Sequence, residues 1–413
     1  MFIRLATKSL LNRKGSVLLT IMAMSVSIFV LLGVEHIRSQ TKESFNSTVS
    51  GVDLIVGART GSLNLLLYSV FRIGAPTNNI DWETYQSISN NPKVAWTIPI
   101  SLGDSHKGYR VMGTTTDYFN YFSYGKKRQL SFSKGKPFAE VFDVVLGSQV
   151  AKKLGYSLGE EIVLAHGLGS TSFSLHRNNP FKVTGILATT GTPVDQTVHV
   201  SLEGIEAIHR NWQPDVTMPG SSSTNKPLHP LELEPEKITA FMLGLTSRMA
   251  TFRIQRDINN YSKEPLSAIL PGVALSELWQ MMGLLENTLR LIAGLILISA
   301  VLGLSAMMLA SIKEREREIQ LLRVIGAPAF YLFLLIELEA LLISFISMLL
   351  GTAGLYLSLI ITRDLLSSNF GLHIGLNILS VNNTLFLLLV AVSTMIAAAI
   401  PSLTVYKVAH RGG

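Results

Sequence analysis

The sequence contains no cysteine and little charge. Of its 413 residues, 15% are Asp, Glu, Lys or Arg, against roughly 25% in ordinary soluble domains. The lack of cysteine excludes disulfides and thiolate chemistry, so a domain outside the cytoplasm must be stable through its core alone. The formal net charge of +7 would suit nucleic acid. However, no patch of interleaved basic and aromatic residues is present, and we expect no nucleic-acid partner.

Motifs for nucleotide or catalytic chemistry are also missing. The pattern GxxxxGK[ST] does not occur, because the Gly-Lys pairs at 125–126 and 135–136 lack the required upstream glycine. The chain therefore encodes no phosphate cradle of this type. No HExxH, GxSxG or paired-carboxylate motif stands out. We expect no catalytic residue and no enzyme activity in this chain.

The histidines of the long polar region follow no metal-binding spacing. None is paired with another at i, i+3 or i+4. A metal site would need several of them to converge in three dimensions, which a sequence does not show. Scattered histidines are the simpler interpretation, and we assign no metal site. The residues concerned are His106, His166, His176, His199, His209 and His229.

Apolar residues are abundant, at 48% of the chain with a mean hydropathy of +0.36. Four uncharged runs carry most of the excess, and a bilayer core requires about 20 such residues per helix. The first run is longer than a signal-peptide core, and no small-x-small cleavage site follows it. We predict four transmembrane helices, over residues 16–38, 283–312, 328–362 and 384–406.

Basic residues near the span ends predict the orientation. They gather in the tail 1–15, the loop 313–327 and the tail 407–413, whereas the loop 363–383 has only Arg363, next to Asp364. The first three segments therefore face the cytoplasm. Residues 39–282 and the short loop 363–383 lie on the other side.

Residues 39–282 resemble a folded mixed domain with stalk helices at both ends. The segments 52–58, 160–165 and 181–188 are rich in β-branched residues and predict strands. Residues 82–90 have helical spacing, residues 142–155 predict a strand, turn and helix, and residues 196–212 predict a strand then a helix. The Pro- and Ser-rich segment 213–235 predicts a loop. The fold class is a membrane protein of four transmembrane α-helices plus a large mixed α+β extracytoplasmic domain, inserted between helices 1 and 2.

The segment KEREREIQLLRVIGA, residues 313–327, concentrates charge between two apolar runs. As a helix it places Glu314, Arg317, Glu318 and Leu321 on one side, and Ile319, Leu322, Arg323 and Val324 around another. Gly326 is placed to end this helix as a C-cap glycine. The segment is therefore a short charged amphipathic helix joined to two spans.

Glu339 stands at the beginning of the third span, where two interpretations remain. In the first interpretation, Glu339 pairs with a basic residue of the preceding loop and fixes the angle of that loop. Alternatively, it is solvated at the membrane surface, where the cost of a carboxylate is small.

These residues resemble a known family. EREREIQLLRVIGA is similar to the E-R-x-x-E-I-x-x-L-R-x-x-G-A motif between transmembrane helices two and three of the FtsX/MacB-like ABC transporter permeases (type VII). IELEALLISFISMLLGTAGLYLSL is similar to their third span, with Glu339 at the position of its usual glutamate. IPSLTVYKVAHR is similar to the end of their fourth span. VMGTTTDYFNYF, DVVLGSQVAKKLGYSLGEEIVLA and FKVTGIL are similar to the MacB-type periplasmic core domain.

The resemblance implies that residues 313–327 are a coupling helix that contacts a separate ABC ATPase subunit. ATP and Mg would bind that partner, and no cofactor is expected in this chain. MacB carries its ATPase on the same chain, so this sequence is more similar to the lipoprotein-releasing LolC/LolE permeases or to FtsX. The implied coupling residues are Glu314, Arg317, Glu318, Ile319, Leu322, Arg323, Gly326 and Ala327.

The resemblance also implies further partners and a location. The partners are a second permease subunit (identical or a paralogue), a periplasmic adaptor or lipoprotein, and membrane lipid. The location is the bacterial inner (cytoplasmic) membrane, multi-pass, with the large domain in the periplasm.

Two functions remain open. One is a mechanotransmission permease that couples ATP hydrolysis to a periplasmic conformational change, for export or extraction of a lipoprotein, peptide or hydrophobic small molecule. The alternative is an FtsX-like signalling subunit that activates a cell-wall hydrolase without transport. The long polar region with MacB-like segments favours the first. A membrane-anchored enzyme that uses the histidines has no supporting motif.

Reporter fusions test the predicted topology. We expect fusions at Ser221 and at Gly326 to report opposite compartments, because the basic residues place 39–282 outside and 313–327 inside. A single compartment for both fusions would contradict the four-span arrangement.

Overall fold

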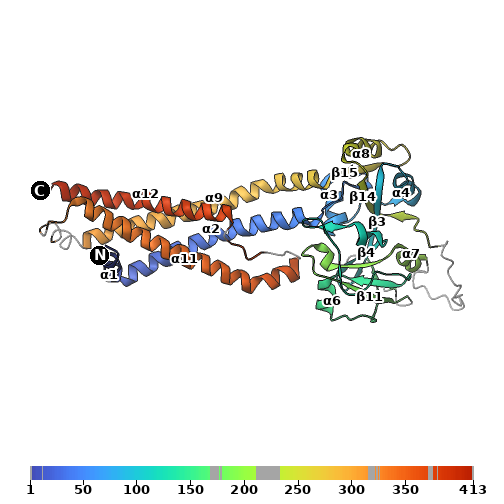
Figure 1. Ribbon diagram of the computed structural model, residues 1–413, viewed down its shortest axis with the longest axis horizontal. Coiled ribbons are helices and arrows are strands. Elements are labelled where there is room, and N and C mark those ends of the chain that lie inside the picture. The colour runs from blue at the N-terminus through green and yellow to red at the C-terminus, as the bar shows by residue number, and fades with distance from the viewer. Residues whose placement is uncertain are drawn as a thin grey trace. The chain divides into compact units, whose positions relative to one another are not determined.

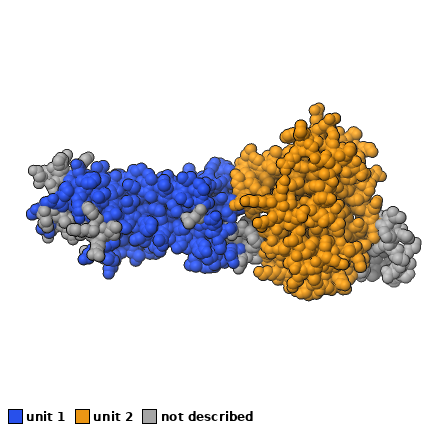
Figure 2. Space-filling model, in the orientation of Figure 1, with its two compact units in different colours: residues 1–41, 282–365, 374–413 blue, residues 42–281, 366–373 orange. Residues whose placement is uncertain are grey.

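The computed structural model describes residues 2–11, 13–167, 176, 179–210, 233–314, 321, 324, 326–370, 375–378 and 380–411 (Figure 1). They belong to two compact units (Figure 2). The helical unit comprises residues 1–41, 282–365 and 374–413. The sheet domain comprises residues 42–281 and 366–373.

Among the described residues, four helices are long and apolar enough to cross a membrane, which confirms the predicted fold class with four transmembrane helices. They are α2 (Lys14–Thr48), α9 (Pro271–Glu314), α11 (Ala329–Phe370) and α12 (Val381–Arg411). At about 1.5 Å per residue, the 35 residues of α2 extend well beyond the roughly 30 Å of a bilayer core. Both α2 and α9 therefore continue past their apolar runs as unbroken helices.

Two segments outside the predicted spans are partly helical. Within the predicted tail 1–15, the structure has helix α1 (Phe2–Leu11). Within the predicted loop 363–383, α11 continues to Phe370. Residues 363–370 contain no glycine or proline, so nothing in the backbone stops the helix at residue 362.

Small and hydroxyl-bearing residues bring the helices of the helical unit together. A Cβ on Gly351 of α11 would lie 2.8 Å from the backbone oxygen of Ser25 in α2, so glycine permits this close approach. Ser305 of α9 donates a hydrogen bond to the backbone oxygen of Ala397 in α12 at 3.0 Å. Such contacts stabilise helix association in lipid, which supplies no hydrophobic driving force. The apolar interior consists of Leu10, Val17, Ile21, Met24, Leu304, Met308, Leu332, Ile336, Ala340, Ile343 and Ala398.

One large mixed sheet forms the centre of the sheet domain. Its strands follow the spatial order β15-β1-β14-β3-β4-β12-β8-β11-β7, with β10 paired to β3 and β9 paired to β11. The pairs β4–β12 and β8–β11 are parallel, and the other pairs of this sheet are antiparallel. The strands are β1 (Leu54–Ala58), β3 (Val94–His106), β4 (Tyr109–Thr114), β7 (Phe132–Gly135), β8 (Asp143–Leu146), β9 (Glu161–Ile162), β10 (Ala165–His166), β11 (Phe181–Leu187), β12 (Thr197–Ser201), β14 (Ala240–Leu245) and β15 (Leu266–Ile269).

Several elements of the sheet domain occur where the sequence predicts them. The helix predicted over 82–90 is α4 (Trp82–Ser89), and the predicted strand, turn and helix are β8 and α6 (Ser148–Leu154). The strand followed by a helix is β12 and α7 (Leu202–Arg210). Most of the predicted loop 213–235 lies outside the described residues. The remaining elements are β2 (Ile80–Asp81), β13 (Lys237–Ile238), β5 (Ser123–Tyr124), β6 (Arg128–Gln129), α3 (Ser62–Leu66), α5 (Asp117–Tyr121), α8 (Thr251–Asn259), a π-helix (Leu67–Phe71) and 3₁₀ turns at Pro193–Gln196 and Arg248–Ala250.

Strand β3 joins the two halves of the large sheet. Its first part pairs with β14, and its second part pairs with β4 and β10. The register with β4 shifts between Leu102 and Ser105, so Gly103 and Asp104 form a β-bulge. A bulge bends the strand and changes the direction of a side chain.

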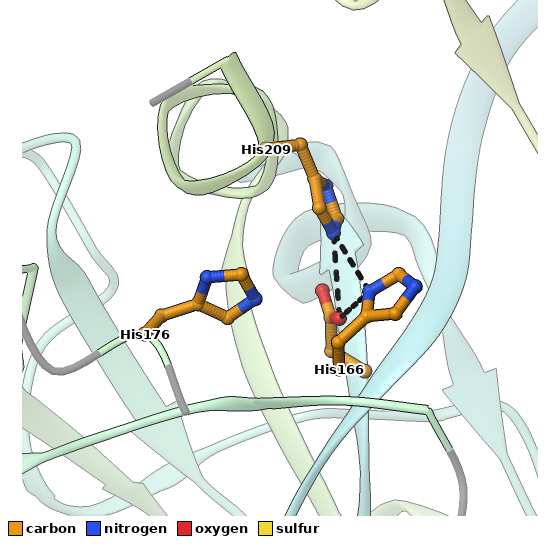
Figure 3. Close-up of side chains that lie close together, drawn as sticks. His166, His176 and His209 are labelled. Atoms are coloured by element: carbon orange, nitrogen blue, oxygen red, sulfur yellow. Dashed lines mark hydrogen bonds and ion pairs between the residues drawn. The ribbon is translucent and has the colours of Figure 1, made fainter. Parts of the chain in front are cut away.

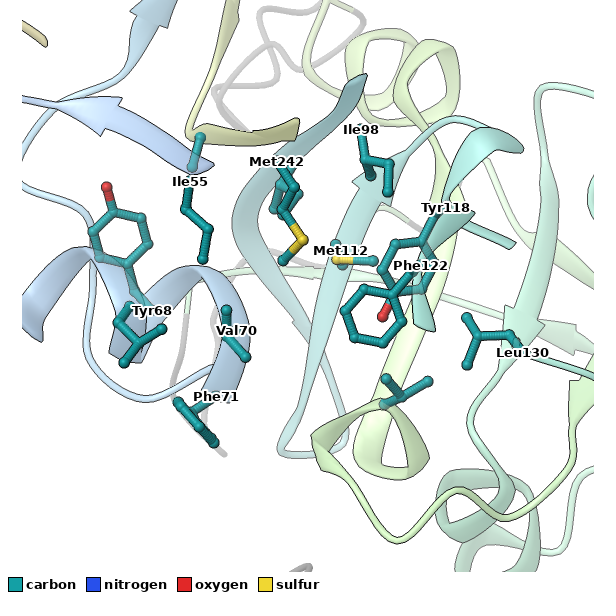
Figure 4. Close-up of a cluster of buried hydrophobic side chains, with 14 of the residues drawn as sticks. Ile55, Tyr68, Val70, Phe71, Ile98, Met112, Tyr118, Phe122, Leu130 and Met242 are labelled. Atoms are coloured by element: carbon teal, nitrogen blue, oxygen red, sulfur yellow. The ribbon is translucent and has the colours of Figure 1, made fainter. Parts of the chain in front are cut away.

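Apolar side chains cover both faces of the sheet. Along β1, Ile55 belongs to one buried cluster, whereas Leu54 and Val56 belong to another, as the two-residue period of a strand requires. Burial on both faces explains why this strand is a continuous apolar run. Figure 4 shows the first cluster, with Ile55, Tyr68, Val70, Phe71, Ile98, Met112, Tyr118, Phe122, Leu130 and Met242.

A fully buried histidine, His199 of β12, is part of this core. Its ring stacks on Tyr118 at 5.3 Å between centroids, and its Nδ1 lies 3.3 Å from the backbone oxygen of Val145. Burial lowers the pKa of His199 to about 3. The folded protein therefore binds fewer protons at this residue than the unfolded chain between pH 6.5 and 3, and this residue makes stability fall as the pH falls through that range.

Urea unfolding at two pH values tests the state of His199. Its contribution to the free energy of unfolding should be about 1.4 kcal/mol lower at pH 5.5 than at pH 7.5. The four tryptophans lie within residues 82–279, so their fluorescence reports the sheet domain of the full-length protein in detergent. His199→Phe should reduce the pH dependence by that amount. An unchanged pH dependence would show that the native protein accommodates the protonated ring.

Candidate functional site

The predicted coupling segment, residues 313–327, follows the end of α9. Glu314 is the last residue of α9, and Gly326 has a φ of 97°, in the left-handed region that favours glycine. Ala327 and Pro328 then precede α11. The other predicted coupling residues lie outside the described residues: Arg317, Glu318, Ile319, Leu322 and Arg323.

Glu339 is buried in the helical unit, with 2% of its side chain exposed. Its Oε2 lies 3.8 Å from Nη2 of Arg13, a residue that precedes α2. The same arginine nitrogen donates to Ser9 Oγ at 3.4 Å. This burial argues against simple solvation of Glu339 at the membrane surface. The described ion pair joins α11 to the N-terminal segment, a contact that neither sequence interpretation contained. The arginines of the preceding loop, Arg315, Arg317 and Arg323, lie outside the described residues.

An ionic network that sequence reasoning missed joins α2 and α9 within the helical unit. Its centre is Glu35 of α2, with a carboxylate that is 3% exposed. Arg38 donates to both of its oxygens, at 2.6 and 3.2 Å, and Arg290 of α9 donates to them at 3.2–3.4 Å. Arg38 also donates to Glu286 of α9 at 3.0 Å. Bidentate guanidinium–carboxylate contacts are among the strongest hydrogen bonds in proteins and restrict geometry.

The segment before α12 also contacts α2, close to this network. His36 Nε2 lies 2.8 Å from the backbone oxygen of Gly375, and the backbone nitrogen of Gly375 donates to Gln40 Oε1 at 2.9 Å. Three parts of the helical unit are therefore linked by polar contacts in this region. The sequence did contain a signal for the ionic network. Glu35 and Arg38 are three residues apart and Glu286 and Arg290 are four apart, so each pair lies on one side of a helix, next to an apolar run.

The structure brings together three of the histidines that the sequence interpretation left scattered. His166, His176 and His209 lie around Asp104 in the sheet domain (Figure 3). The hydrogen bond to the Asp104 carboxylate raises the pKa of His209, and burial lowers the pKa of His176. The other histidines of that prediction lie apart from this group or outside the described residues: His106, His199 and His229.

Comparison with known proteins identifies similar families. The model of the MacB-like periplasmic core domain matches residues 17–226, half of the chain. The model of the FtsX-like permease C-terminal domain matches residues 290–409. No curated protein sequence matches.

Two solved structures are similar at low identity. The periplasmic region of MacB from Actinobacillus actinomycetemcomitans is 11% identical, with 56% of this chain and 94% of that chain covered and a TM-score of 0.35. The extracellular domain of the ABC-type transporter YknZ from Gram-positive bacteria is 10% identical, with 53% and 99% covered and a TM-score of 0.32. Because both TM-scores are low, the family assignment depends on the two sequence-family matches.

Replacement of Glu35 tests the ionic network. Glu35→Leu leaves Arg38 and Arg290 without their shared carboxylate and should destabilise the helical unit by about 2 kcal/mol. The cost should be below that of a fully buried pair, because the Arg290 side chain is 43% exposed and can reach water. Unfolding in detergent, followed by helical circular dichroism during titration with SDS, measures this loss.

The matched control is Glu286→Leu, which removes a carboxylate with a single described ion pair. We expect a cost below about 1 kcal/mol for this change. Equal stability losses for the two variants would show that Glu35 is no more important to the ionic network than Glu286.

Proposed function

Because the chain belongs to the family of FtsX- and MacB-like ABC transporter permeases, we propose that it is the permease subunit of a mechanotransmission-type transporter in the bacterial inner membrane. It couples ATP hydrolysis in a separate ATPase subunit to a conformational change of the sheet domain outside the cytoplasm. The change serves export or extraction of a lipoprotein, a peptide or a hydrophobic small molecule.

The continuity of α2 and α9 is the observation that carries this proposal. Each helix extends without a break from an apolar membrane run into residues of the sheet domain. An unbroken helix transmits displacement along its axis because every turn is held by its own backbone hydrogen bonds. A force applied at the cytoplasmic end of α9 therefore has a stiff route to the sheet.

Two sets of contacts make α2 and α9 move as a pair. In the helical unit, Glu35 joins them through Arg290. In the sheet domain, Trp279 of α9 donates to Asn46 Oδ1 at 3.2 Å and packs edge-on against Phe45 of α2, with 5.7 Å between ring centroids. Phe45 also stacks on Phe71 of the buried core at 4.6 Å. Motion of the paired helices therefore reaches the core of the sheet domain directly.

The partners of this machine follow from what the chain lacks and exposes. The sequence has no phosphate-binding loop of the GxxxxGK[ST] type, so ATP and Mg bind the partner ATPase. At most half of each candidate span is buried within the chain. The remaining apolar surface suits membrane lipid and a second permease subunit.

Substitutions in the coupling segment test the proposal. Ile319→Asp with Leu322→Asp puts two charges into the apolar contact expected with the ATPase. Each unpaired buried charge costs several kcal/mol, so ATPase binding should weaken by at least about 100-fold. Co-purification of the ATPase with the membrane-inserted chain measures binding, and an ATP-dependent change in tryptophan fluorescence of the sheet domain measures coupling.

The control variant is Leu321→Asp, which places a charge on the opposite side of the same helix. This side chain is 62% exposed, and we expect both ATPase binding and the fluorescence change to persist. Normal ATPase binding by the double Asp variant would show that residues 313–327 are a solvated loop, and it would remove the basis for the coupling assignment.

A further inference from the structure

The group of Asp104, His166, His176 and His209 is assembled by the sheet itself. Asp104 is in the bulge of β3, and His166 of β10 is its direct partner in the antiparallel register. Residues opposite each other in this register direct their side chains to the same face. His209 comes from the last turn of α7. The backbone nitrogen of His176 donates to the oxygen of Leu164 at 2.9 Å, which places His176 next to β10.

Three donor atoms in this group form a nearly equilateral triangle. Asp104 Oδ1 lies 3.2 Å from His166 Nδ1 and 3.4 Å from His209 Nε2, and the two nitrogens are 3.3 Å apart. Ligands about 2.0–2.1 Å from a tetrahedral zinc ion are separated from one another by about 3.3–3.4 Å. The three distances therefore match one face of a zinc coordination tetrahedron.

His176 is placed to supply the fourth ligand. A ligand atom of His176 lies within 4.8 Å of the other three, and Figure 3 shows its ring directed toward theirs. The residue is 7% exposed, and its Nε2 has no hydrogen-bond partner among the described residues. A buried polar atom without a partner is costly, so coordination of a metal would satisfy it.

Hydrogen bonds alone do not give each of these three atoms a suitable partner. Each nitrogen of a neutral imidazole is either a donor or an acceptor. His166 Nδ1 and His209 Nε2 can each bond to the Asp104 oxygen only as N–H donors. The two donors then face one another at 3.3 Å. A cation in place of the two protons removes this conflict, because all three atoms then direct lone pairs at it.

We propose that Asp104, His166, His176 and His209 bind one divalent transition-metal ion, with Zn²⁺ as the expected ion. Three imidazole nitrogens and one carboxylate oxygen suit tetrahedral Zn²⁺. Ca²⁺ and Mg²⁺ require mainly oxygen ligands. Without cysteine in the chain, the group offers no thiolate of the kind that soft Cu(I) prefers.

The surroundings of the four residues hold the ligand side chains in place and still leave a path for a metal ion to enter and leave. The backbone oxygen of Ile205, one helical turn before His209, interacts with the His209 ring. Such a bond orients a ligating histidine and fixes its tautomer. The Asp104 side chain is 1% exposed, but the His166 side chain is 50% exposed. A metal can therefore enter from the His166 side, and it would fasten α7 to β3 and β10.

Titration of the full-length protein with Zn²⁺ tests the proposal. The detergent-solubilised chain is stripped with a chelator, and Zn²⁺ binding is followed by calorimetry with Mg²⁺ and Ca²⁺ present. We expect one Zn²⁺ per chain and a higher Tm of the sheet domain with Zn²⁺, because a ligand that binds only the folded state stabilises it. His166→Ala and His209→Ala should each weaken binding by at least about 100-fold, more than the loss of a residue that only orients a ligand.

The matched control is His106→Gln, which changes a histidine on the same strand as Asp104. The ring of His106 is already bonded to Val163 O at 2.7 Å and Tyr156 Oη at 3.0 Å. This variant should bind Zn²⁺ as the unchanged protein does. The proposal would be overturned if the unchanged protein showed no saturable Zn²⁺ binding, or if both alanine variants bound Zn²⁺ as tightly as the unchanged protein.

A spectroscopic measurement on the unchanged protein keeps the test decisive if the alanine variants fail to fold, which their melting without metal would reveal. Co²⁺ in a tetrahedral site absorbs strongly in the visible range, whereas six-coordinate Co²⁺ absorbs weakly. We expect the strong spectrum with one equivalent of Co²⁺ and its loss when Zn²⁺ is added. A weak six-coordinate spectrum would overturn the assigned site. None of these measurements requires the ATPase, so they are independent of the coupling function.

Discussion

A single buried carboxylate, held by arginines of two helices, joins α2 to α9. Glu35 is nearly buried, and the guanidinium groups of Arg38 and Arg290 lie next to its carboxylate. These contacts restrict the rotation of α2 against α9 at the ends of the predicted spans 16–38 and 283–312. The rings of Phe45 and Trp279 then hold the same two helices together within the sheet domain. Within each unit, these contacts restrict the motion of α2 against α9.

Much of the fold could be predicted because its signals are local. Uncharged runs of sufficient length have few alternatives to membrane helices, and the strand and helix of residues 142–155 occur as predicted. The hairpin of β3 and β4 was missed, because Pro99 and Gly103 interrupt the strand pattern. The structure accommodates Gly103 in a bulge. It turns the chain at Lys107 and Gly108, whose φ angles of 47° and 86° suit a two-residue hairpin loop.

The candidate sites also differ in whether their signals are local in the sequence. The coupling role of residues 313–327 is a prediction from the family resemblance, and the charges, apolar residues and Gly326 of that segment lie within fifteen consecutive positions of the sequence. The ionic network joins residues more than 240 positions apart, such as Arg38 and Glu286. The histidine group depends on the register of β10 against β3 and on a bulge that directs Asp104. Neither a bulge nor a pairing register can be derived from residue spacing, because both depend on how strands far apart in the sequence pair in the sheet.

The strand order of the sheet has a consequence for how the protein is made. Strand β1 comes early in the chain but lies between β14 and β15, which come last in the domain. At synthesis rates of about 5–20 residues per second, roughly 10–40 seconds pass between the emergence of β1 and that of β15. Both edges of this apolar strand stay unpaired until β14 emerges, and one edge stays unpaired until β15 emerges, a condition that promotes wrong pairing. We therefore expect β1 to need protection from wrong pairing while the rest of the domain is synthesised.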